Sequence, residues 1–160
     1  MYPIYVSLLV HFVGIGLLFT ALIGTWVVGG IYRAAPDWQM KALHLKTLRR
    51  LGLMSPVGVV IMVVTGIGNM TLGPYTYTLF SDAWLSAKLA LFVVSILLGV
   101  LSTFQAMRRS RAVNRLAAGE TTKVDEGSLR GIETQLKISS TLQFLLILAM
   151  ILLSIARPLG

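Results

Sequence analysis

Two histidines have the widest chemical range of any residues in this sequence, because neutral imidazole is the commonest metal ligand in proteins. His11 lies about eight residues into an uncharged apolar run, or roughly 12 Å along a helix at 1.5 Å per residue. Helical spacing places it on the smallest and most polar stripe of that run, which holds Ser7, His11, Gly14, Leu18, Leu22 and Thr25. We expect this stripe to face the interior of a helical bundle.

The depth of His11 favours two interpretations. The functional one is an axial ligand to haem or a ligand to copper, because ionisable groups inside a membrane span are expensive and mark sites. The structural one is a buried histidine bonded to a carbonyl or hydroxyl of a neighbouring helix. His44 falls in a basic segment at the opposite edge of the membrane, so we predict that the two histidines cannot share one metal.

Other side chains are candidates for a second role near the same membrane face. Met150 lies at a similar depth to His11, as do Met62 and Met70, and methionine is a haem ligand as well as a common core filler. Lys88 lies one turn inside the outer boundary, where it could snorkel to the interface, pair with Asp82 or act as a functional cation.

Several chemistries are excluded by composition. The chain has no cysteine, which removes disulfides, thiolate metal sites and cysteine nucleophiles. Its spans hold no acidic residue, and its glycines follow no phosphate-binding motif, so hydrolysis and phosphoryl transfer are not supported.

The elements that position these residues are four long apolar segments. Apolar residues make up 56% of the chain and charged residues only 12%, which indicates a lipid environment. The predicted spans are 3–31, 51–72, 83–107 and 138–156, each about the length that crosses a bilayer core. Because unpaired backbone groups are costly in lipid, the spans must be helices. The sequence therefore predicts an all-α, four-transmembrane-helix bundle in a single membrane domain, residues 1–160.

Orientation follows from the basic residues of the connections. Segments 32–50 and 108–137 carry most of the lysines and arginines, whereas 73–82 carries none, so the two basic segments are predicted to be cytoplasmic loops. The N-terminus and the C-terminus are then both non-cytoplasmic. Aromatic residues fall at the predicted outer boundary, as a membrane belt requires: Tyr2, Tyr5, Tyr75, Tyr77, Phe80 and Trp84.

The formal charge of +8 suggests a partner of opposite charge. Since the basic residues adjoin apolar spans, anionic lipid headgroups are the predicted partner, and no nucleic acid is expected. The many glycines favour close packing against other membrane protein subunits or a second copy of the chain.

A short set of motifs resembles the superfamily that contains HemJ-type protoporphyrinogen oxidases and CopD-type copper-resistance proteins. They are His11 with Trp26, Arg50-Leu51 before Ser55-Pro56 and Thr65-Gly66, and the run from Trp84 to Leu89. The resemblance implies a four-helix bundle in a bacterial cytoplasmic (inner) membrane that binds haem b or handles copper near its outer side. Carried over, it makes His11 a metal or cofactor ligand and Lys88 a functional cation. The third-helix histidine of HemJ-type proteins is absent here.

Three functions follow as hypotheses. The first is a haem-associated redox protein of this superfamily, with His11, Met150 and Lys88 at the cofactor. The second is a non-catalytic transmembrane subunit of a larger membrane complex. The third is copper transport or resistance, with His11 and methionines as ligands.

Overall fold

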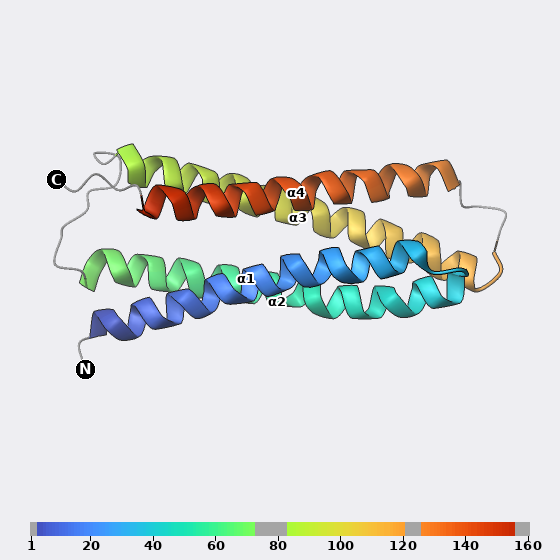
Figure 1. The fold of residues 1–160 in the computed structure, drawn as a ribbon, viewed down its shortest axis with the longest axis horizontal. Helices are drawn as coiled ribbons and strands as arrows, with labels where there is room; N and C mark the ends of the chain where they lie inside the picture. The colour runs from blue at the N-terminus through green and yellow to red at the C-terminus, as the bar shows by residue number, and fades with distance from the viewer. Residues whose placement is uncertain (1–2, 73–82, 121–125, 156–160) are drawn as a thin grey trace. The chain divides into compact units, whose positions relative to one another are not determined.

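The protein is an all-α chain in a computed structural model that describes residues 3–72, 83–120 and 126–155. These residues form four α-helices (Figure 1): α1 (Pro3–Ala34), α2 (Trp38–Leu72), α3 (Ala83–Ala117) and α4 (Glu126–Ile155). All four are long and apolar enough to cross a membrane. The predicted fold class of four membrane-spanning helices is therefore confirmed. The placement of both termini outside the cytoplasm stays a prediction.

The chain divides into two units, each built around an antiparallel pair of helices. Unit 1 is Met1–Tyr77 and contains α1 and α2, and unit 2 is Thr78–Gly160 and contains α3 and α4. Within each unit the two helices run side by side along most of their length (Figure 1).

The helices are longer than the predicted spans. At 35 residues each, α2 and α3 reach about 52 Å, whereas a bilayer core is about 30 Å thick. The predicted connection 32–50 is therefore helical except between the end of α1 and the start of α2. Asp37 starts α2 as its N-cap, because its Oδ1 accepts the backbone N–H of Met40 at 2.7 Å.

The predicted connection 108–137 is helical over much of its length, because α3 continues to Ala117 and α4 begins at Glu126. After Ala117, the backbone of α3 closes with Glu120 N–H donating to the Arg115 carbonyl at 3.0 Å and Gly119 N–H donating to that of Leu116 at 3.1 Å. Gly119 has a φ of 83°, the left-handed conformation that this type of helix end requires and that glycine adopts without strain. Near this connection, Val113 and Leu116 of α3 and Leu129 of α4 are buried.

Close backbone approach defines the packing of α1 on α2. A Cβ atom added to Gly58 would lie 3.0 Å from the Gly14 carbonyl oxygen, and one added to Gly14 would lie 2.9 Å from Ile61 Cγ2. Leu18 and Leu22 of the same α1 stripe are buried. The stripe that contains His11 therefore faces α2, in agreement with the predicted inward orientation.

A polar seam joins α3 to α4. Its α3 members follow a seven-residue spacing at Lys88, Ser95 and Ser102, which keeps them on one face of the helix. Ser102 Oγ lies 2.6 Å from Ser139 Oγ, and Gln143 Nε2 donates to the Ser95 carbonyl at 3.4 Å. Hydrogen bonds of this kind hold neighbouring helices together in lipid.

Some predicted features lie outside the described residues. They include the outer connection 73–82 with most of the predicted aromatic belt, Tyr2, and Asp82, which was a candidate partner for Lys88.

Candidate functional site

The imidazole of His11 is held at the α1–α2 interface by a hydroxyl of the facing helix. His11 Nδ1 lies 2.7 Å from Oγ1 of Thr65, a residue only 7% exposed. His11 itself is half-buried. This contact agrees with the expectation that the histidine bonds to a neighbouring helix, and it leaves a metal-binding role open because imidazole has two ring nitrogens.

The rest of this polar cluster comes from the two helices that meet there. The Thr65 hydroxyl donates to the Ile61 carbonyl at 2.6 Å, and the Ser7 hydroxyl donates to the Thr65 carbonyl at 3.3 Å. Ser7 and His11 are one turn apart on α1, so both point at the same stretch of α2. Gly68 completes the cluster, since a Cβ at that position would lie 3.1 Å from Ser7 Oγ.

A thioether lies one turn further along the same interface. Met62 packs where α1 has Gly14, with its Cγ 3.1 Å from the position of a Gly14 Cβ. Gly14 follows His11 by three residues and Met62 precedes Thr65 by three, which places both pairs at adjacent turns. Met62 was one of the methionines predicted to lie near the depth of His11, and the structure places it beside the histidine's own helix.

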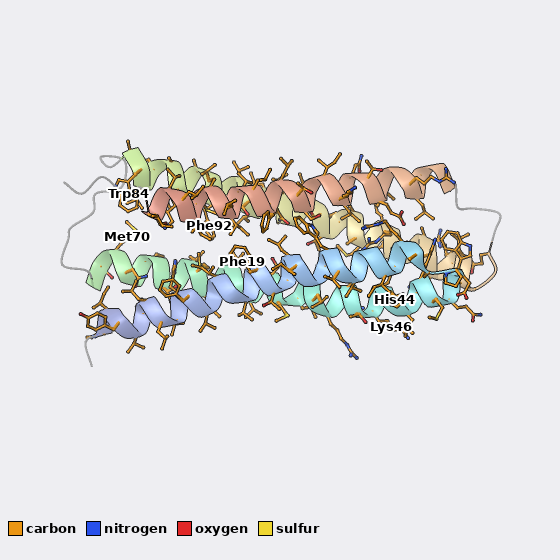
Figure 2. All side chains as sticks on the ribbon, in the orientation of Figure 1. Phe19, His44, Lys46, Met70, Trp84 and Phe92 are labelled. Atoms are coloured by element: carbon orange, nitrogen blue, oxygen red, sulfur yellow. The ribbon has the colours of Figure 1, made fainter. Side chains whose placement is uncertain are left out.

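His44 is remote from this cluster. It lies 21 residues before Thr65 on the continuous helix α2, a separation of about 31 Å. Figure 2 shows it, with Lys46, in the part of α2 near the turn from α1. Because both histidines lie in unit 1, this separation confirms the prediction that His11 and His44 of one chain cannot share a metal.

Two other predicted residues come together in unit 2. Lys88 Nζ donates to Ser154 Oγ at 2.7 Å, and the Ser154 hydroxyl donates to the carbonyl of Met150 at 2.8 Å. Met150 is buried, with 8% of its surface exposed. Trp84 marks the start of α3 near this end of the hairpin (Figure 2). Lys88 and Met150 therefore share one region of α3 and α4, whereas His11 belongs to unit 1.

Sequence reasoning missed the two residues that hold these candidates. Thr65 was visible only as part of the Thr65-Gly66 motif, and Ser154 carried no signal at all. Their roles depend on which residues face each other across a helix pair, and an uncharged apolar run does not encode that.

The donor set around His11 suits a soft metal ion. Within the described ranges, no three side chains of His, Cys, Asp or Glu lie together in a way that could hold a metal. The side chains available are an imidazole, a thioether and hydroxyls. Imidazole and thioether together favour copper, and thioether in particular favours copper(I), whereas Mg²⁺, Ca²⁺ and Mn²⁺ prefer carboxylates.

The opposite end of unit 1 carries an aromatic and basic cluster. Lys41 Nζ lies 4.4 Å from the ring centroid of Trp38 and 5.9 Å from that of Tyr32. Tyr32 is 1% exposed, and Lys46, Arg49 and Arg50 are exposed on the following turns. The contact with Trp38 lies within α2, and the longer contact with Tyr32 brings the charge of Lys41 to α1 at the end where the basic residues gather.

Comparison with known families gives a match over much of the chain. The model of the family described as "CopD: Copper resistance protein D" matches residues 45–157, more than two thirds of the chain. The matched range contains α3, most of α2 and all described residues of α4, and it leaves out α1 with His11. Comparisons with curated proteins and with solved structures gave no match.

Proposed function

Because this chain belongs to the copper resistance protein D family, we propose that it is an integral membrane protein that handles copper ions, with His11 as a ligand. The predicted likeness to CopD-type proteins is confirmed by the family match. The family description names copper. The α1–α2 interface contains two kinds of side chain that bind copper, an imidazole and a thioether. Met62, one turn away, supplies a thioether as a second donor.

One observation carries the proposal. The His11 imidazole lies inside the predicted outer leaflet, and its Nδ1 is 2.7 Å from a buried threonine hydroxyl of α2. Metal-binding histidines almost always have one ring nitrogen hydrogen-bonded to an oxygen atom, which orients the ring so that the other nitrogen can bind the metal. His11 has this arrangement within the uncharged apolar part of α1.

Copper(I) binding by the purified full-length protein in detergent tests the proposal. The probe is copper(I) itself, titrated in competition with a coloured copper(I) chelator. His11→Ala should weaken binding at least tenfold, whereas His44→Ala should leave it unchanged. The second variant is a matched control because it removes the other histidine, about 31 Å away along α2. Equal affinity in wild-type and His11→Ala protein would exclude His11 as the ligand.

Haem b is the second candidate, because the same imidazole could bind a haem iron. The α1–α2 seam itself cannot admit a porphyrin, since Gly14 and Gly58 bring the two backbones into near contact. A haem on His11 would have to lie outside this seam. A Soret band in the purified protein that disappears in His11→Ala would favour haem over copper, and Met150→Ala would then test the predicted second ligand.

A non-catalytic role in a larger complex would give a different result. The protein would be colourless, would not bind copper(I), and would co-purify with other membrane subunits. We also propose that the exposed cations Lys46, Arg49 and Arg50 contact anionic headgroups of a bacterial inner membrane. Stabilisation of the detergent-purified protein by added anionic lipid, relative to added zwitterionic lipid and compared between wild-type and a triple alanine variant, tests that contact.

A further inference from the structure

The short contacts around Thr65 determine which ring nitrogen of His11 carries hydrogen. Three atoms lie in a chain: His11 Nδ1, Thr65 Oγ1 at 2.7 Å, and the Ile61 carbonyl oxygen at 2.6 Å from that hydroxyl. Two hydrogen bonds need two hydrogens. The carbonyl has none and the threonine has one, so the imidazole must supply the other.

The reverse arrangement is unfavourable. If Thr65 donated to Nδ1, its oxygen and the Ile61 carbonyl oxygen would face each other at 2.6 Å with no hydrogen between them. A threonine hydroxyl that donates to the carbonyl four residues earlier is an ordinary helical conformation. Thr65 is also buried, at 7% exposure, so bulk water does not compete for the hydroxyl.

We infer that Thr65 is a positioning residue that holds neutral His11 in the Nδ1–H tautomer, with the lone pair on Nε2. The hydrogen-bond chain places a hydrogen on Nδ1. The neutral state, and with it the lone pair on Nε2, follows from the position of His11 within an uncharged apolar span, where a charged imidazolium is costly. The use of this tautomer for metal binding rests on the proposed function: Nε2 is the nitrogen that binds the ion, and Nδ1 stays bound to Thr65. An oxygen that accepts this N–H fixes the ring orientation and raises the basicity of the ligating nitrogen.

Isosteric substitution separates this role from packing. Thr65→Val keeps the β-branched shape but removes the acceptor, and Thr65→Ser keeps the hydroxyl while removing a methyl group. A purely structural role would make Thr65→Ser the more disruptive variant, because it loses a methyl group and Thr65→Val loses no volume. The inferred role requires Thr65→Ser to resemble the wild-type protein and Thr65→Val to differ.

Nitrogen NMR of the metal-free protein, labelled with ¹⁵N-histidine, reads the tautomer directly. His44→Ala provides a background in which His11 is the only histidine. At a pH where the ring is neutral, we expect a protonated-type signal for Nδ1 and an unprotonated-type signal for Nε2. Thr65→Val should lose this pattern and Thr65→Ser should retain it. A proton on Nε2 in the parent, or an unchanged pattern in Thr65→Val, would overturn the inference.

Copper(I) titration of the same variants distinguishes the inference from the proposed function. Thr65→Val should bind copper(I) about 10–100-fold more weakly and Thr65→Ser should recover most of the affinity. If the NMR pattern follows Thr65 but copper(I) binding is equal in wild-type, both Thr65 variants and His11→Ala, copper ligation by His11 fails while the tautomer assignment stands. If the NMR pattern does not follow Thr65, the assignment itself fails.

Discussion

Replacing Gly58 by alanine tests the close approach of α1 and α2 that positions His11. The new Cβ would lie 3.0 Å from the Gly14 carbonyl oxygen and 3.0 Å from Leu18 Cγ. Carbon atoms pack best at about 3.5–4.0 Å from each other. The Leu18 side chain can rotate away, but the carbonyl belongs to the backbone of α1. The helix must therefore move by a few tenths of an ångström.

The size of the effect can be isolated with a second glycine of α2. Overpacking a well-packed interface costs about 1–3 kcal/mol, while glycine-to-alanine in a helix gains about 1 kcal/mol from propensity. Gly66→Ala receives the same gain without the clash, because nothing lies within 4 Å of its Cβ position. We therefore expect Gly58→Ala to be less stable than Gly66→Ala by about 1–3 kcal/mol.

The assay is reversible unfolding of the purified protein in mixed micelles, followed by circular dichroism as the denaturing detergent increases. Both variants are compared with the wild-type protein under the same conditions. If Gly58→Ala and Gly66→Ala unfold at the same midpoint, the backbones do not approach at Gly58 as the structure shows. The orientation of His11 towards Thr65 would then lose its structural basis, since the same interface positions both.

Three further predictions concern capping, the polar seam and orientation. Asp37→Ala should cost about 1 kcal/mol by removing the N-cap of α2, and Asp37→Ser should cost much less; equal losses would contradict the capping role. Ser139→Ala should cost about 0.6 kcal/mol in the same unfolding assay. Combining it with Ser102→Ala should add little, because both substitutions remove the same hydrogen bond between the two side chains. Since the chain has no cysteine, Thr71→Cys should react with an impermeant thiol reagent in intact cells and Ser128→Cys only after permeabilisation; the opposite pattern would invert the predicted orientation.

Hydropathy alone identified the four helices of this protein. Each apolar run is long enough to span a bilayer, and lipid leaves the backbone no alternative to helix. The helices extend beyond the predicted spans because hydropathy marks where a helix meets lipid and not where its hydrogen bonds end. The start of α2 at Trp38 depends on Asp37 as a cap, a local signal inside a segment that is otherwise basic and polar.

The candidate site could be predicted only in part. His11 stood out because an ionisable side chain within a span is costly, and the small residues of its stripe indicated that it faces another helix. Met62 was visible as a residue of suitable depth. Lys88 was visible as a cation inside a span, but its partner Ser154 was not.

The sequence by itself determined that His11 lies inside the membrane and on the packed side of α1. Only the tertiary structure decided that it meets Thr65 and that the Thr65 hydroxyl donates to the Ile61 carbonyl, the two contacts from which we infer a proton on Nδ1. The physical reason is that contacts between two helices depend on their relative rotation and axial register. In spans where nearly every residue is apolar, those two quantities are set by where glycines let the backbones approach.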